Sequence, residues 1–176
     1  MKSFLLIAFL IISGNLFSQH LIEPNEDCIY SFKTKNGKTM MLAKDKNDQY
    51  IIYRFGTNAH IDFEFPQTKD STSWSQFSYN YYFRGGGYQN AGLDIDNLIF
   101  ENKGYQYIVF SSYSAGEKKN DEHFSIGIII TDKKSENKTI IKGRNNTEVG
   151  NLQGFRTNEM IKINQEGGLE DDSGSM

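Results

Sequence analysis

The run His60-Ile61-Asp62-Phe63-Glu64 holds the side chains best suited to metal binding or acid–base chemistry. With a period of two, His60, Asp62 and Glu64 share one face of a strand, where they could ligate a metal ion or supply the paired carboxylates of a glycosidase. The same alternation is the ordinary pattern of a half-buried strand with a solvated polar face. We therefore expect no metal site and no catalytic residue here, and keep a hydrolase of unrecognised type as an alternative function.

Other patterns that could carry catalysis are incomplete. Asp94-Ile95-Asp96-Asn97 begins like a calcium-binding loop, but Leu98 and Ile99 stand where that loop needs an oxygen ligand and a glycine. The chain has no Gly-x-Ser-x-Gly nucleophile elbow and no His-Glu-x-x-His motif. The sequence therefore predicts a protein that is not an enzyme and that uses no cofactor.

A glycine-rich segment after an aromatic strand has the composition of a recognition surface. It lacks the Gly-Lys-Ser/Thr of a phosphate-binding P-loop. Tyrosine and arginine are enriched at interface hot spots, while glycine and asparagine give an adaptable backbone. A plain connection between two strands, with Tyr81 and Phe83 in the core, is the structural alternative. The residues that we expect to contact a partner are Tyr82, Arg84, Gly85, Gly86, Gly87, Tyr88 and Asn90.

These residues predict a non-catalytic binding protein whose partner is another protein, of the inhibitor or immunity type. A cell-wall or carbohydrate-binding module is the alternative, in which exposed Trp74, Tyr82 and Tyr88 would stack on a glycan. Nucleic acid is not an expected partner, because 19 basic residues stand against 22 acidic ones and the net charge is -3. Nonspecific nucleic-acid binding needs clustered cations.

The N-terminal residues 1–18 have the layout of a secretory signal peptide: a positive start at Lys2, an apolar run over residues 4–12, and a small polar exit. We expect cleavage after Ser18, export to the periplasm or the extracellular space, and no stable membrane anchor after cleavage. The single cysteine, Cys28, cannot form a disulfide within the chain. Its period-two spacing with Tyr30 and Phe32 favours burial on their face, with pairing between chains as the alternative.

From Cys28 onward, short alternating runs separated by turn residues predict an all-β fold of about eight to ten strands. Asn36-Gly37 between residues 29–34 and 38–43 predicts a hairpin with a type I′ turn. We expect a single antiparallel domain over residues 19–164, either an up-and-down barrel or a sandwich, and the early hairpins favour the barrel. Residues 165–176 lack aromatic residues and collect acidic ones, which predicts a disordered acidic tail.

Overall fold

The computed structural model describes residues 20–116, 118–165 and 168–175. The predicted signal peptide lies outside the described residues. No helix in the described ranges is long and apolar enough to cross a membrane.

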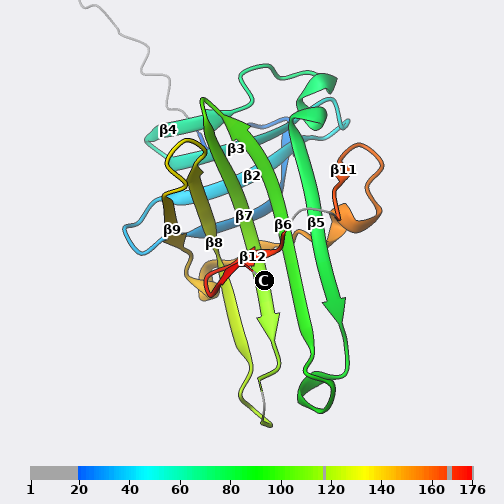
Figure 1. Ribbon diagram of the computed structural model, residues 1–176. Coiled ribbons are helices and arrows are strands. Elements are labelled where there is room, and N and C mark those ends of the chain that lie inside the picture. The colour runs from blue at the N-terminus through cyan, green and yellow to red at the C-terminus, as the bar shows by residue number, and fades with distance from the viewer. Residues whose placement is uncertain (1–19, 117, 166–167, 176) are drawn as a thin grey trace, which may run out of the picture.

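The chain forms two β-sheets packed face to face (Figure 1). The first has the order β10-β1-β2-β3-β4 and contains β1 (Glu26–Lys33), β2 (Thr39–Asp45), β3 (Ile51–Thr57), β4 (His60–Phe65) and β10 (Val149–Gly150). The second has the order β11-β5-β6-β7-β8-β9 and contains β5 (Phe77–Arg84), β6 (Leu93–Asn102), β7 (Tyr105–Ser114), β8 (His123–Asp132), β9 (Lys138–Lys142) and β11 (Lys162–Ile163). Strands β12 (Glu170–Asp171) and β13 (Gly174–Ser175) form a separate hairpin. The described residues also form short 3-10 helices that connect these elements: η1 (Ser71–Gln76), η2 (Gly87–Asn90), η3 (Asn145–Thr147) and η4 (Gln153–Thr157).

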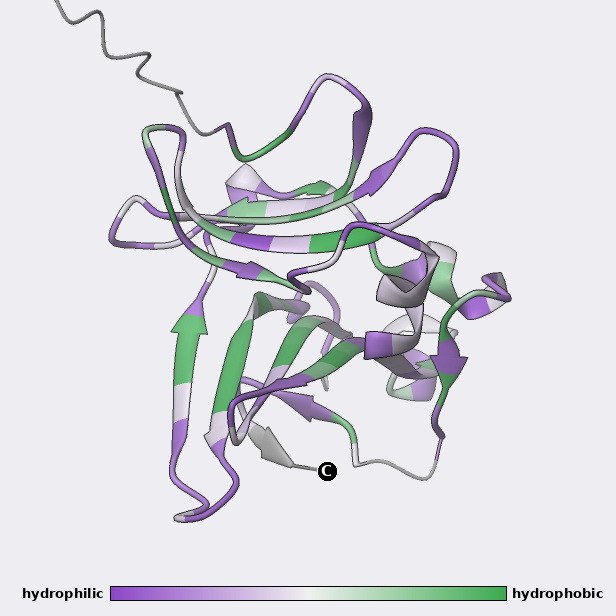
Figure 2. Ribbon diagram, turned by 90° about the horizontal axis from the view of Figure 1, so that it is seen from above, coloured by the Kyte–Doolittle hydropathy of each residue, from purple (hydrophilic) through white to green (hydrophobic). Residues whose placement is uncertain are grey.

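The all-β prediction is confirmed, but the preference for an up-and-down barrel is wrong. The strands pair into two sheets, which meet along one edge where Thr34 after β1 bridges to Gly143 after β9, and Figure 2 shows them from above as two layers. The arrangement is that of a sandwich. The domain is also not purely antiparallel, because β11 pairs parallel to β5. That pairing joins residues more than eighty positions apart in sequence, and no local pattern predicts it.

The hairpin between β1 and β2 is confirmed, although its turn differs from the predicted one. Within the turn, Gly37 has a positive φ of 82° and Asn36 does not. A type I′ turn needs positive φ at both central residues, so the turn is of another type. Asn36 acts through its side chain instead, which accepts a 2.5 Å hydrogen bond from the Thr34 hydroxyl.

Aromatic side chains from both sheets form the core between them. Phe100 of β6 stacks on Phe65 of β4 with ring centroids 4.6 Å apart, and on Tyr107 of β7 at 4.8 Å. Such offset pairs add to the stabilisation from area burial. Leu152 and Phe155, from the segment around η4, are buried in the same cluster. This segment therefore closes one side of the sandwich.

Cys28 does not lie on the core face with Tyr30 and Phe32. A β-bulge interrupts the register between Cys28 and Tyr30, so Cys28 pairs with Ala43 while Tyr30 pairs with Leu42. The extra residue moves Cys28 to the opposite face of the sheet, and the cysteine is half-buried there. The prediction of a core cysteine is wrong, because the alternation of residue types along a sequence does not reveal where a β-bulge inserts an extra residue.

The C-terminal segment is ordered where the structure describes it, which corrects the prediction of a disordered acidic tail. Strand β12 packs across β6, β7 and β8 on the face away from the first sheet (Figures 1 and 2). Its acidic residues have specific partners: Lys138 lies 2.8 Å from Glu170, and Lys142 lies 2.8 Å from Asp172. Two of the charges that suggested disorder, those of Glu170 and Asp172, are matched by lysines of β9.

Candidate binding surface

The second sheet extends beyond the first. In Figure 1, β1–β4 run across one end of the long strands β5–β8, and the opposite ends of those strands project past them. Along β5 the inner side chains accordingly change from buried to open: Tyr79 is fully buried, whereas Phe83 is 62% exposed. The alternation of residues along β5 correctly predicted which side chains face inward. The first sheet, however, does not extend far enough to cover the last of them.

The predicted recognition segment lies at this projecting end. It comprises Arg84, the last residue of β5, the turn η2, and the return to β6, and we name residues 84–92 the tip loop. The loop stands at the lower end of β5 and β6 in Figure 1. The residues that connect β7 to β8 reach the same end, and the amide of Ala115 donates to the carbonyl of Gly92 at 2.8 Å. Two connections are thus joined at one tip.

Internal hydrogen bonds hold the tip loop in shape. The Asn90 side-chain amide donates to the carbonyl of Gly85 at 2.8 Å, and the Arg84 Nε donates to the carbonyl of Ala91 at 2.8 Å. Gly86 has a φ of 98°, a conformation that favours glycine. The glycines therefore build a defined turn, rather than only lending flexibility.

Two of the predicted aromatic residues are presented to solvent. Tyr82 and Tyr88 are about two-fifths exposed. Tyr82 lies on the outer face of β5 with Arg84, whose guanidinium carbon is 6.0 Å from the Tyr82 ring centroid. The structure therefore brings Tyr82 and Arg84 together at the base of the loop, while Tyr88 stands in η2.

On the inner face of the same end, one residue from each of four strands forms a continuous row. Phe83 pairs with Asp94, Asp94 with Tyr113, and Tyr113 with Phe124. The Tyr113 and Phe124 rings are 5.0 Å apart and tilted by 48°. We name these four residues the inner row. It is an aromatic surface, interrupted by one carboxylate, that the first sheet leaves uncovered.

Arg156 of η4 reaches over the inner row. Its guanidinium hydrogen-bonds to Asp94, and to Asp96 at 2.8 to 3.0 Å, and its Cζ lies 5.0 Å from the Tyr81 ring centroid and 5.7 Å from that of Phe83. Burial raises the pKa of Asp96, an effect that its bonds to Tyr79 and Arg156 only partly oppose. Arg156 therefore fixes the connection between the sheet and η4 and compensates part of the buried negative charge.

Beside this cluster lies an open cleft of about 230 Å³. The inner face of β6–β8 forms one wall and the segment around β10 the other. We name it the inner cleft; its lining includes Asp94, Asp96, Ser111, Tyr113, Phe124 and Glu148.

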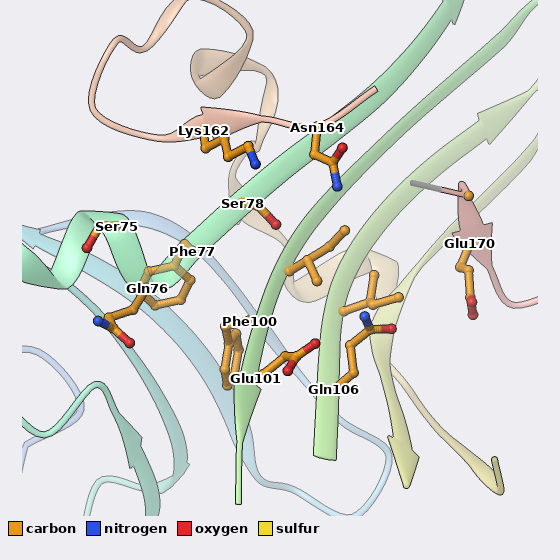
Figure 3. A pocket seen from close by; sticks show the side chains of 13 residues that line it. Ser75, Gln76, Phe77, Ser78, Phe100, Glu101, Gln106, Lys162, Asn164 and Glu170 are labelled. Carbon is orange, nitrogen blue, oxygen red and sulfur yellow. The ribbon is translucent and has the colours of Figure 1, made fainter. Parts of the chain in front are cut away.

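A second, larger hollow of about 460 Å³ lies on the outer face of the second sheet (Figure 3). It forms where the chain leaves β11 and crosses toward β12. Glu101, Gln106 and Lys162 line it with serine and asparagine side chains, and Ile99 and Ile108 belong to the same lining. Glu101 is paired with Lys133 at 2.6 Å, and the aromatic Phe77 and Phe100 belong to the core. The hollow thus offers no exposed aromatic surface, and it is remote from the tip loop.

The residues of the hydrolase alternative do not form a common site. His60 Nε2 lies 3.7 Å from Asp62, which also pairs with Lys38, while Glu64 accepts a 2.6 Å hydrogen bond from Arg54. The described residues contain no group of three or more His, Cys, Asp or Glu side chains placed to hold a metal ion. Glu64 therefore pairs with Arg54, apart from the contact between His60 and Asp62.

The glycan alternative also loses one of its residues. Trp74 is buried in the core, and its indole nitrogen donates to the carbonyl of Asp48 at 3.0 Å. It cannot stack on a sugar at the surface, so the expectation of an exposed Trp74 is wrong. Tyr88 on the protruding tip loop and Tyr82 on β5 at its base remain exposed.

Sequence reasoning missed the inner row and Arg156. The available signal was the position of Asp94 and Asp96, which continue the alternation of the core residues Leu98 and Phe100. Carboxylates at core positions of a strand indicate either a cationic side chain buried beside them or a functional site. Nothing local marks Arg156 as their partner, since it lies about sixty residues away in an irregular segment.

Comparisons with protein-family models, with curated proteins and with solved structures found no match to this chain.

Proposed function

We propose that this chain is an exported, non-catalytic binding protein that engages a protein partner through the tip loop. The observation that carries the proposal is the placement of the loop: it protrudes from the uncovered end of the second sheet, and its own hydrogen bonds define its turn. A rigid loop loses little conformational entropy on binding. Exposed tyrosines and an arginine are the side chains most enriched at interface hot spots.

Export is part of this proposal and rests on the sequence of residues 1–18. The single cysteine is free and half-buried. A core without disulfides is compatible with both the periplasm and the extracellular space. An inhibitor or immunity role fits a small protein that presents one protruding loop.

The glycan-binding alternative is supported by a different observation, the uncovered aromatic rings of the inner row. Sugars stack on flat exposed rings, and Phe83 and Phe124 are both more than half exposed. The two functions therefore place the ligand on different surfaces of the same tip.

The double substitution Arg84→Ala with Tyr88→Ala is expected to weaken binding of a partner captured from envelope or secreted extracts. Two hot-spot side chains together contribute about 2–4 kcal/mol, so the affinity of the purified partner should fall by at least about thirtyfold. The mature protein serves as bait, and titration calorimetry with the purified partner gives the affinity.

The matched control is Tyr105→Ala. Tyr105 is as exposed as Tyr88 but lies at the other end of the second sheet, where β7 begins. It should leave the affinity within about twofold, since it lies outside the proposed interface. Equal losses from both variants, or an unchanged affinity of the double variant, would show that the tip loop is not the interface.

A further inference from the structure

The described lining of the inner cleft contains more negative than positive side chains. Its lining includes the carboxylates of Asp94, Asp96 and Glu148 and no lysine, arginine or histidine. Arg156 bonds to both aspartates and supplies one positive charge against three negative ones. These four side chains together carry a formal net charge of about -2.

Glu148 is the carboxylate that remains available to a ligand. Asp96 is buried and bonded to Tyr79 and Arg156, and both oxygens of Asp94 accept hydrogen bonds, from Arg156 and Gln153. Glu148 is exposed and, among the described residues, accepts through Oε1 from the hydroxyl of Tyr30 at 2.8 Å. This bond to a fully buried tyrosine orients the carboxylate and leaves Oε2 for another donor.

Aromatic rings form the neighbouring wall. Phe124 is 56% exposed, and Tyr113 leans against it from the adjacent strand. The face of an aromatic ring attracts cations, and it also packs against the methylene groups of lysine and arginine side chains. On its other side, Phe124 borders a separate hollow that contains Lys35 and Lys142, and Lys142 is paired with Asp172.

We propose that the inner cleft receives a lysine or arginine side chain presented by the protein partner. The proposal rests on the protein-binding function proposed above, because the cleft opens beside the tip loop on the same projecting end. The methylene groups of the side chain lie along Tyr113 and Phe124, and its cationic group bonds to Glu148. Charge complementarity selects a basic residue, since a neutral occupant would leave a net negative charge without a counter-ion as the interface dries.

The test uses small probes that reproduce the side chain alone. Backbone amide chemical shifts of the mature protein are followed by NMR during titration with Nα-acetyl-lysine methylamide, with the arginine analogue, and with the norleucine analogue as an uncharged probe of similar length. N-acetylglucosamine is titrated separately as the glycan probe. We expect saturable shifts with the two basic probes, confined to the strands and segment that line the cleft, and none with norleucine.

Two variants and one control test the assignment. Glu148→Gln keeps an oxygen for Tyr30 but removes the charge, and should weaken binding of the lysine probe about tenfold or more. Phe124→Ala, at an exposed ring, should weaken it about threefold. Glu101→Gln removes a carboxylate on the opposite face of the same sheet and should leave the affinity unchanged.

Several results would overturn the proposal: no saturable shift with either basic probe, equal binding of norleucine, shifts centred outside the cleft, or saturation by N-acetylglucosamine alone. The last would assign the cleft to a glycan. Failure of the cleft is separable from failure of the tip loop, because partner binding by the Arg84→Ala, Tyr88→Ala variant is measured independently of the probes.

Discussion

Replacing Glu26 by glutamine is expected to lower the free energy of unfolding by about 3–5 kcal/mol, because it removes the fully buried counter-charge of the Arg54 guanidinium. Glu26 and Arg54 both have fully buried side chains. They form a two-pronged contact, with Arg54 Nη1 and Nη2 donating to the two carboxylate oxygens at 2.5 and 2.8 Å. Urea unfolding followed by the fluorescence of the single, buried Trp74 measures the change.

The surroundings of Arg54 explain why this residue tolerates burial. Its Nε donates to Glu64 at 2.6 Å and its Nη1 donates to the carbonyl of Leu21 at 3.0 Å. The chain just after the predicted cleavage site therefore crosses the outer face of the first sheet and covers the arginine. Removing one partner of such a cluster costs more than the pair contributes, because the remaining charge stays in a dry site.

Glu23→Gln is the matched control. Glu23 contacts the same guanidinium at 3.4 Å, but its side chain is 43% exposed. Water can replace this contact, so the expected loss is below about 1 kcal/mol. Similar losses from Glu23→Gln and Glu26→Gln would contradict the distinction between the buried and the exposed partner.

The pH dependence of stability follows the same cluster. Burial alone would raise the pKa of Glu26, but the hydrogen bonds and charge of Arg54 and the amide of Glu23 outweigh it and hold the pKa below its ordinary 4.5. Stability from this carboxylate is therefore fully present above pH 4.5 and is lost as the pH falls through the lowered folded value. In Glu26→Gln this part of the acid destabilisation should disappear.

Deleting residues 166–176 is expected to cost on the order of 3 kcal/mol of unfolding free energy, because it uncovers apolar side chains on the outer face of the second sheet. Ile108, Phe110 and Ile129 form a separate buried cluster there, and β12 packs across the three central strands that carry or border it. The deletion should lower the thermal midpoint and increase binding of a hydrophobic dye. Thermal unfolding followed by circular dichroism gives the midpoint.

A variant that removes only charges distinguishes the stability contributed by ion pairs of this segment from that contributed by its burial of apolar side chains. Glu170→Gln with Asp172→Asn removes the acidic partners of Lys138 and Lys142 but keeps the covering chain. The lysines are about half exposed while the carboxylates are mostly buried, and glutamine and asparagine keep an oxygen that can accept hydrogen bonds there. The variant should therefore lose about 1 kcal/mol, less than the deletion. A deletion that left the midpoint unchanged would restore the disordered tail that composition predicts.

The features predicted correctly are those whose causes lie within a few residues. The alternation of Ile61, Phe63 and Phe65 marked a strand, and Asn36-Gly37 marked a hairpin, because both depend on local backbone geometry. Burial of Arg54 was not predictable from its strand, since its main partner Glu26 lies 28 residues away. The covering C-terminal segment was missed for the same reason: composition reports charge, and the lysines that match it belong to β9.

Within the candidate site, too, the features that depend on local sequence were predictable and those that depend on distant residues were not. Tyr82, Arg84 and Tyr88 were predicted from composition, and the structure places them on or beside one protruding loop. The depth of each residue along β5 was not predictable, because it depends on where the other sheet ends: Phe77 and Phe83 are equivalent in the alternation but not in exposure. The inner row with Arg156 exists only after four strands and η4 have come together.

Hydrogen–deuterium exchange of the mature protein, alone and in complex with its captured partner, tests the central claim most directly. We predict that protection on binding centres on the tip loop and on its anchoring amides in β5 and β6. The outer hollow lined by Glu101 and Lys162 should exchange at the same rate in both states. Protection centred on that hollow, or on the edge strand β9, with the tip loop unchanged would contradict the proposal that this protein binds its partner through the tip loop.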